Sequence, residues 1–309
     1  MKQPNSSTHV VRISLLVDVL DVALNVLVAI ITGSAVMVAE ALQGTADLAT
    51  TALLLVGIKS SKRGADTNHP FGHGREVYFW TLMSGILMLA ITATTSFYNG
   101  LQHILHPQII EDLSAALFVL GVGIISNSYA FYLSFNRLTS AHKDMPLWEI
   151  ISTSSLIEVK ATFILDLIGT LSAAVGLVSL FFVVLTGSTL FDGIGAMGIG
   201  ISMALLSTLL ILDVKDLLVG RGAPSAIEQD IKETALAIKG VEAVLDLRTM
   251  YIGSDKLLVN LELDIAPHLE TAQIERLVDI IKAELKAKVP SVHHVQIELE
   301  TPVKRGSRD

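Results

Sequence analysis

The chain has 309 residues, of which 51% are hydrophobic, only 17% are charged and none is cysteine. Soluble domains carry about 25% charged residues, so this composition, with a mean hydropathy of +0.59, predicts a polytopic membrane protein. The absence of cysteine excludes a disulfide scaffold, a thiolate zinc site and a cysteine nucleophile. The net charge of −8 argues against a nucleic-acid partner.

The uneven placement of charge predicts two domains. Residues 1–214 consist mostly of long apolar runs and are predicted to form a six-helix transmembrane domain in a lipid bilayer. Residues 215–309 are richer in charge and are predicted to form a cytoplasmic α+β domain. The six spans are expected near residues 10–32, 35–58, 78–103, 112–136, 153–184 and 190–214.

Basic residues in the short loops predict the orientation. They follow the second, fourth and sixth spans and are absent from the three opposite loops. Positive residues stay on the cytoplasmic side, so both termini are expected to be cytoplasmic, in a cell inner membrane or an organellar membrane. The basic residues concerned are Lys59, Lys62, Arg63, Arg75, Arg137, Lys143, Lys215 and Arg221.

The small domain is predicted from its hydrophobic periodicity. Residues 225–238 and 271–288 have the spacing of amphipathic helices, and residues 241–252, 257–265 and 293–300 have the pattern of strands. The predicted order is therefore helix, strand, strand, helix, strand.

Polar side chains inside the spans are functional candidates because charge is costly in a bilayer. Gln43 and Asp47 in the second span, and Thr162 and Asp166 in the fifth, are each four residues apart and therefore share a helix face. Two such helices could close around a cation at mid-membrane depth. The alternative is that the two aspartates are satisfied by neighbouring polar groups. Glu158 lies one turn before Thr162.

Other polar residues of the spans support more than one interpretation. Lys160 could neutralise Glu158 or extend toward the membrane surface. Asp192 could orient a neighbouring group or cap the helix of the sixth span, and His103 and His106 at the end of the third span are interpreted as interfacial.

The loop after the second span predicts a metal site. Asp66, His69 and His73 lie within eight residues, and Gly72 and Gly74 permit a tight backbone. Imidazole and carboxylate are common ligands of zinc and other transition metals. A loop with incidental histidines remains the alternative.

The motifs resemble those of the cation diffusion facilitator family of divalent-metal transporters over nearly the whole chain. They begin with Gly33-Ser34, Ala39-Glu40-Ala41 and Asp47. They continue with Asp66-x-x-His69-Pro-Phe-Gly-His73-Gly, Asp166, Asp192 and Asp246-Leu-Arg-Thr249. The segments His69–Trp80 and Leu217–Gly222 resemble the branch of zinc transporter nine.

The resemblance implies a homodimer whose protomers have six spans and a cytoplasmic ferredoxin-like, metallochaperone-like domain that dimerises. It also implies a secondary transporter, not an enzyme, that exports a divalent cation from the cytoplasm, with no organic cofactor and commonly in exchange for protons by alternating access. The family's membrane site falls on Gln43, Asp47, Thr162 and Asp166, and its loop site falls on Asp66, His69 and His73.

Two departures from the family pattern bear on the ion. Gln43 and Thr162 stand where zinc members usually have His or Asp, so the membrane site would bind through oxygen alone, which suits Mn²⁺, Fe²⁺ or Mg²⁺ better than Zn²⁺. Without an imidazole there, Asp47, Asp166 or Glu158 would carry the proton. The cytoplasmic domain also lacks the usual regulatory ligands, so it is expected to dimerise without a metal pair. The residues at those positions are Leu245, Asn260, Gln296 and Glu298.

The sequence therefore predicts a homodimeric transporter of Zn²⁺, Mn²⁺ or Fe²⁺ that works by proton-coupled alternating access. The alternative is a transport-deficient homologue that serves as a regulatory or scaffold partner, which the loss of two usual ligands would explain.

Overall fold

The structure is a computed structural model that describes residues 6–140, 147, 150 and 155–300, with side chains described from Asp18 onward except that of Ser140. It divides into two compact units. Unit 1 comprises Met1–Lys59, Phe79–Ser152 and Ile157–Lys215, and unit 2 comprises Ser60–Tyr78, Thr153–Leu156 and Asp216–Asp309. Unit 2 thus contains the loop after the second predicted span as well as the C-terminal domain.

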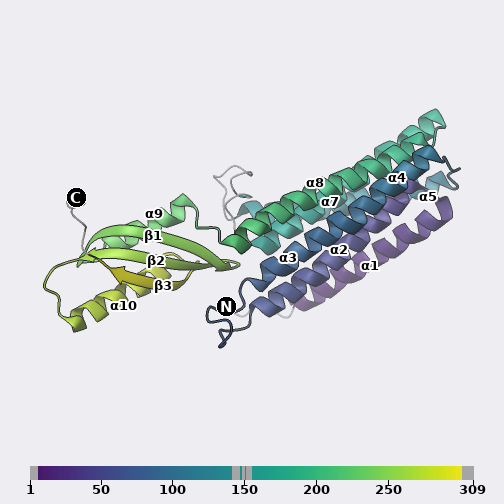
Figure 1. The fold of residues 1–309 in the computed structure, drawn as a ribbon. Coiled ribbons are helices and arrows are strands. Elements are labelled where there is room, and N and C mark those ends of the chain that lie inside the picture. The colour runs from purple at the N-terminus through teal and green to yellow at the C-terminus, as the bar shows by residue number, and fades with distance from the viewer. Residues whose placement is uncertain (1–5, 141–146, 148–149, 151–154, 301–309) are drawn as a thin grey trace, which may run out of the picture. The chain divides into compact units, whose positions relative to one another are not determined.

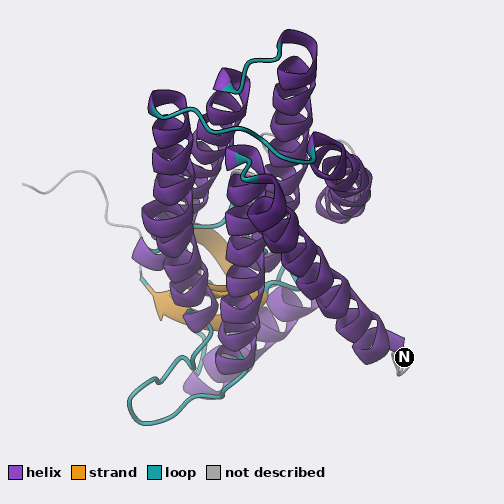
Figure 2. Ribbon diagram, turned by 90° about the vertical axis from the view of Figure 1, so that its right-hand side faces the viewer, coloured by secondary structure: helices purple, strands orange, loops and turns teal. Residues whose placement is uncertain are grey.

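Unit 1 is built from six long helical rods in the described part of the chain (Figure 1). Its elements are α1 (Ser6–Thr32), α2 (Ala35–Ser61), α3 (Glu76–Leu87), the π-helix η1 (Met88–Ala93), α4 (Thr94–Leu105), α5 (Leu113–Ser140), α7 (Ile157–Thr186) and α8 (Leu190–Val219). Elements α3, η1 and α4 follow one another without a break and form a single rod. The rods lie side by side in both ribbon views (Figure 2).

Five of these rods, α2, α3–α4, α5, α7 and α8, are long and apolar enough to cross a membrane. Helix α1 has 27 residues, enough to span about 30 Å of hydrocarbon. The rods agree with the six predicted spans, and the chain is a multi-pass integral membrane protein. The start of the predicted fifth span, residues 153–154, lies outside the described residues.

Small residues let the rods of unit 1 approach closely. A Cβ atom on Gly195 of α8 would lie 2.3 Å from Ser179 Oγ of α7 and 2.7 Å from Val36 Cγ2 of α2. Such contacts fix α2, α7 and α8 against one another, since association within a bilayer depends on close packing. The predicted membrane-site residues lie on two of these three helices.

Unit 2 contains a three-stranded sheet with the order β1-β2-β3, and the predicted order of its elements is confirmed. Strand β1 (Val241–Gly253) pairs antiparallel with β2 (Lys256–Ile265), which pairs parallel with β3 (Val292–Leu299). Helices α9 (Ser225–Leu236) and α10 (Thr271–Lys288) pack on the sheet and on each other.

The core of unit 2 follows from alternation along β2. Leu257, Val259, Leu261 and Leu263 are fully buried while the residues between them are partly exposed, as period-2 side-chain geometry requires. The buried faces of the two helices cover them, through residues such as Ile231 and Ile281. The result is the predicted compact α+β module.

Candidate metal sites

In unit 2, a tight turn places the side chain of Asp66 next to the backbone of His69. Oδ1 of Asp66 accepts hydrogen bonds from the backbone N–H groups of Asn68 at 2.9 Å and His69 at 2.7 Å, the pattern by which Asp stabilises local turns. Gly72 has a φ of +80°, and its N–H donates to the carbonyl of His69 at 2.9 Å. Glycine adopts this left-handed conformation without steric cost, so the chain can turn again before His73.

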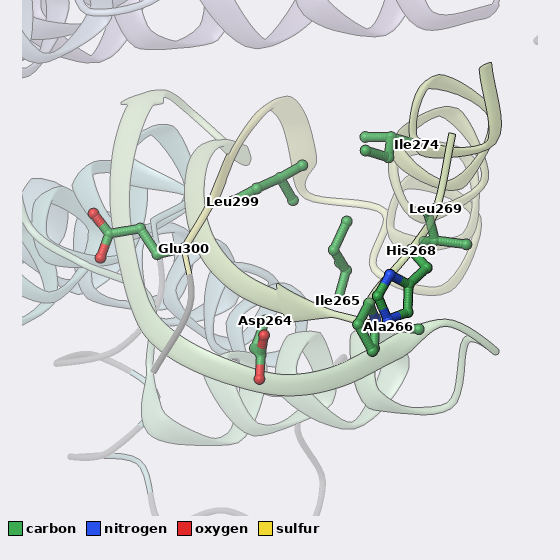
Figure 3. Close-up of a pocket in the computed structure, with 9 residues that line it drawn as sticks. Asp264, Ile265, Ala266, His268, Leu269, Ile274, Leu299 and Glu300 are labelled. Atoms are coloured by element: carbon green, nitrogen blue, oxygen red, sulfur yellow. The ribbon is translucent and has the colours of Figure 1, made fainter. Parts of the chain in front are cut away.

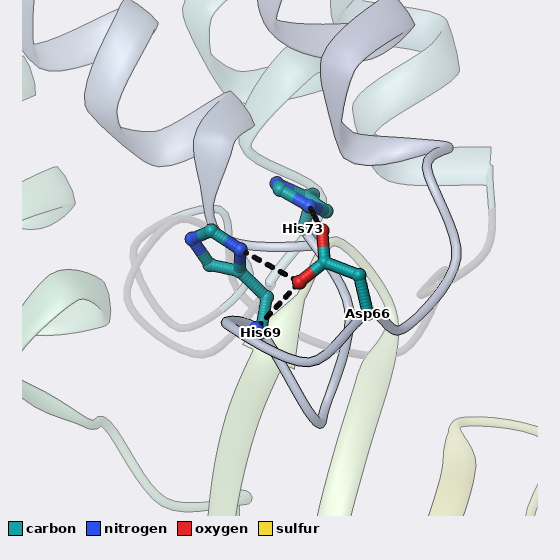
Figure 4. Close-up of side chains that lie close together, drawn as sticks. All are labelled: Asp66, His69 and His73. Carbon is teal, nitrogen blue, oxygen red and sulfur yellow. Dashed lines mark hydrogen bonds and ion pairs between the residues drawn. The ribbon is translucent and has the colours of Figure 1, made fainter.

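The turn places three ligand atoms together, as Figure 4 shows. His69 Nδ1 lies 3.1 Å from Asp66 Oδ1, and His73 Nε2 lies 3.0 Å from Asp66 Oδ2. One ligand atom from each residue lies within 4.8 Å of the others, and this is the one such group among the described His, Asp and Glu residues. Two imidazoles and one carboxylate that leave a fourth position open match a three-ligand zinc set.

Hydrogen bonds around the loop site shift the pKa values of two of its three residues. The hydrogen bond with His73, followed by the backbone N–H of His69, holds the pKa of the Asp66 carboxyl well below its ordinary value. Hydrogen bonds to Asp66 and then Glu76 raise the pKa of His73. Glu76 Oε1 lies 2.9 Å from His73 Nδ1, so Nε2 is the nitrogen left for a metal, and an outer carboxylate of this kind orients a ligand imidazole.

The loop also contacts the sheet of unit 2. Nη2 of Arg75 donates to the carbonyl of Tyr251 at 3.3 Å, and the Phe71 ring meets the His294 ring edge-on at a centroid distance of 5.4 Å. A cavity of about 270 Å³ lies between the loop and the end of β1, lined by residues such as His73 and Ile252. The spacing of residues in the sequence did not predict these contacts, because they join segments that are more than 170 residues apart in the chain.

In the membrane unit, the predicted residues on α2 form a pair. Nε2 of Gln43 donates to Oδ2 of Asp47, and Gln43 is only 4% exposed. The other carboxylate oxygen of Asp47, Oδ1, is buried and accepts no hydrogen bond from a described residue. A buried carboxylate oxygen without a donor is unusual and is available to a cation.

The predicted residues on α7 are arranged differently. The Thr162 hydroxyl donates to the backbone carbonyl of Glu158 at 2.9 Å, so only its lone pairs remain for a ligand. Asp166 is partly buried, one turn after Thr162 on the same helix face. The four residues therefore belong to two helices of one unit, while their joint coordination of an ion remains a prediction.

Lys160 has a partner that the sequence did not indicate. Its Nζ lies 2.5 Å from Asp213 Oδ2 on α8, and the Lys160 side chain is 1% exposed. Lys160 therefore does not extend to the surface, one of the two expectations for it. Pairing with Asp213 was missed because the two residues lie on different helices, more than fifty positions apart.

A further cavity of about 550 Å³ lies at the edge of the unit 2 sheet (Figure 3). Asp264, His268 and Glu300 line it together with apolar residues. The carboxylate of Glu300 and the ring of His268 lie at opposite sides of this view. The ligand atoms do not converge, so this cavity is not assigned a metal.

Comparisons with known proteins identify the family. The cation efflux transmembrane domain matches residues 11–219, and the cation efflux protein cytoplasmic domain matches residues 223–302. A similar relative is the proton-coupled zinc antiporter SLC30A9, mitochondrial, of Xenopus laevis, with 28% identity over 97% of this chain and 60% of the relative. Its Homo sapiens counterpart is 25% identical over 94% of this chain and 58% of its own length.

The chain thus spans about three fifths of the length of these curated relatives. Among solved structures, the nickel form of a MamM CTD variant is 21% identical and covers 26% of this chain and all of its own, with a TM-score of 0.24. At that score the likeness carries no argument. The two domain matches cover nearly the whole chain and confirm the predicted family and its zinc-transporter-nine-like branch. The chain belongs to the cation efflux, or cation diffusion facilitator, family of secondary transporters.

Proposed function

We propose that this protein is a divalent metal cation antiporter that exports Zn²⁺, Mn²⁺ or Fe²⁺ from the cytoplasm in exchange for protons. The observation that carries the proposal is Asp47, whose carboxylate atom Oδ1 is buried and has no donor among the described residues. Asp47 lies on α2, which packs against α7, the helix that carries Asp166. A cation between the two carboxylates would relieve their repulsion and satisfy the open oxygen.

The proposed membrane site consists of Gln43, Asp47, Thr162 and Asp166. The two aspartates supply the negative charge that replaces part of the ion's hydration shell. Gln43 orients Asp47 through its hydrogen bond and offers its own amide oxygen. All donors are oxygen atoms, which favours Mn²⁺ and Fe²⁺ and leaves Mg²⁺ possible, whereas the zinc antiporter relatives favour Zn²⁺.

The remaining parts of the proposal concern coupling and assembly. Glu158, one turn before Thr162, is the candidate proton carrier. Asp66, His69 and His73 form a second metal site on the cytoplasmic side. Residues 215–309 form the dimerisation domain of a homodimer, residues 1–214 form the transport domain, and both termini are cytoplasmic. The membrane is the cell inner membrane or that of an organelle.

The test is metal flux through the full chain reconstituted in liposomes under a pH gradient. Zn²⁺, Mn²⁺, Fe²⁺ and Mg²⁺ are supplied separately, and Asp47→Ala and Asp166→Ala are compared with wild type. A charged ligand contributes about 1.5–3 kcal/mol, so each variant should lose about 10-fold or more in apparent affinity. Asp230→Ala, which removes an exposed carboxylate of α9, is the matched control. Wild-type flux in both membrane-site variants would refute the proposed site.

A second candidate function is a transport-deficient regulatory or scaffold partner. The observation that favours it is that the Thr162 hydroxyl donates to its own helix, at a position where zinc members have a stronger ligand. Absence of flux of all four ions in wild-type liposomes, with the protein folded and dimeric, would favour this candidate over the antiporter.

A further inference from the structure

Asp192, at the start of α8, holds the beginning of α2. Its carboxylate accepts hydrogen bonds from the Ser34 hydroxyl at 2.5 Å and from the backbone N–H groups of Ala35 at 2.6 Å and Val36 at 3.1 Å. Asp192 and Ser34 are fully buried. The first N–H groups of a helix have no partner within the helix, so a carboxylate from another helix supplies the N-terminal cap of α2.

A histidine lies against the same carboxylate. His103 Nε2 on α4 lies 3.3 Å from Asp192 Oδ2, with 6% of the His103 side chain exposed. The contact lacks the geometry of a well-directed hydrogen bond, so Nε2 is buried beside a negative charge without a fully formed partner. His103 is the one histidine with a described side chain in the helices of unit 1. Imidazole ordinarily changes its charge near neutral pH.

A polar cavity reaches this histidine. It measures about 340 Å³, and its polar lining consists of Asn99, Gln102, His103, His106 and Gln108. The Nδ2 group of Asn99 is buried and has no hydrogen-bond partner among the described residues. A roomy site with free polar groups can hold water, which gives protons a path to the imidazole.

We propose that His103 and Asp192 form a proton-binding site at the end of the bundle where α2 begins, separate from the metal sites. This inference rests on the proposed antiport function, for which it names a proton acceptor. Two other titratable groups lie near His103 among the described residues. They are Asp192 of α8, which contacts its ring, and His106 after α4, which lines the same cavity. At the start of α2, the groups that contact Asp192 are the hydroxyl of Ser34, just before the helix, and the backbone N–H groups of Ala35 and Val36.

A proton fits this site better than a metal does. The oxygens of Asp192 already accept three hydrogen bonds and face His103. The described His, Asp and Glu residues form a group of three ligands at Asp66, His69 and His73, and none at His103. A proton needs only the imidazole and a nearby counter-charge.

Protonation at His103 has a route to the transport site. An imidazolium would form a charge-assisted bond with Asp192 and compete with the N–H groups of Ala35 and Val36 for the same carboxylate. Helix α2 continues from this cap to Gln43 and Asp47. Proton occupancy at one end of the helix would therefore bias the position of the proposed metal ligands, and by linkage metal binding would change the proton affinity of His103.

The first test measures His103 directly in the wild-type full chain in lipid nanodiscs. Deuterium exchange at the imidazole C2 position, followed by mass spectrometry from pH 5 to 9, gives a titration midpoint for each histidine. Because Nε2 of His103 lies 3.3 Å from Asp192 Oδ2, we expect the exchange rate at His103 to depend on pH, and this dependence to change in Asp192→Asn. An exchange rate at His103 that shows no titration, or a midpoint unaffected by Asp192→Asn, would overturn the proposal.

The second test follows metal flux against pH on the side of the cavity. His103→Gln keeps a hydrogen-bond donor near Asp192 but cannot take up a proton, so the dependence of the flux on pH should become weaker than in wild type. His106→Gln changes an exposed histidine of the same cavity and should keep the wild-type profile. A wild-type profile in His103→Gln would overturn the proposal. If wild type transports none of the ions, the proposed function fails, and the titration of His103 still decides the proton site.

Discussion

The contact between the metal-binding loop and the sheet of unit 2 depends on a glycine. A Cβ atom on Gly74 would lie 2.4 Å from the Ile252 carbonyl oxygen and 3.1 Å from Gly253 Cα. Ordinary carbon–oxygen contacts are about 3.3–3.6 Å, so the two segments would have to separate by about 1 Å. Both segments meet through backbone atoms, and no side-chain rotation can relieve the overlap.

Gly74→Ala should therefore weaken the attachment of the loop. Overpacking of this kind typically costs about 1–3 kcal/mol, and a middle value of about 2 kcal/mol changes the ratio of attached to detached loop by about 30-fold. The attached state protects the N–H of Gly72, bonded to His69 at 2.9 Å, and that of Tyr251, bonded to Arg221 at 3.0 Å. Both amides should exchange with solvent faster by a similar factor.

The assay is hydrogen–deuterium exchange of the full chain in lipid nanodiscs, read by mass spectrometry on peptides covering residues 60–78 and 249–257. The matched control is Gly64→Ala, in the same loop, where no atom lies within 4 Å of the added Cβ. Equal protection of both peptides in Gly74→Ala, Gly64→Ala and wild type would refute the claim that this backbone contact holds the loop.

Two further predictions concern charged groups. The raised pKa of His73 means that a proton competes with metal at pH values above 6.5, so Zn²⁺ affinity at the loop should fall as pH drops through that raised value. Without metal, the contact with Asp66 stabilises the loop below pH 6.5 and weakens as pH rises through the raised pKa. Calorimetric titration with Zn²⁺ from pH 5.5 to 8.5 measures the affinity of the loop for the metal. A Zn²⁺ affinity independent of pH would contradict this prediction. Asp213→Asn should lower the thermal unfolding temperature more than Lys160→Met, because Lys160 is 1% exposed and Asp213 is 17% exposed. Breaking such a buried pair costs about 3–5 kcal/mol, and equal melting temperatures for the two variants would contradict the assignment.

The sequence by itself determined the class of molecule, the spans and the order of the small domain. Apolar runs of about 20 residues, and alternation along residues 257–265, are local signals that reflect what each segment can bury. The loop ligands were also visible because Asp66, His69 and His73 lie close together in the chain. Their arrangement follows from one turn, which Asp66 and Gly72 shape locally.

Tertiary structure alone decided the contacts between distant segments. The ion pair of Lys160 with Asp213, the cap that Asp192 places on α2, and the position of His103 beside it all join different helices. A helical pattern shows which residues share a face but not which partner that face meets. The sequence pattern also did not show that residues 60–78 belong to the same compact unit as the C-terminal domain. The two segments meet at contacts such as the close backbone approach at Gly74 and the hydrogen bond from Arg75 to Tyr251. These segments are too far apart in the chain for local periodicity to reveal their contact.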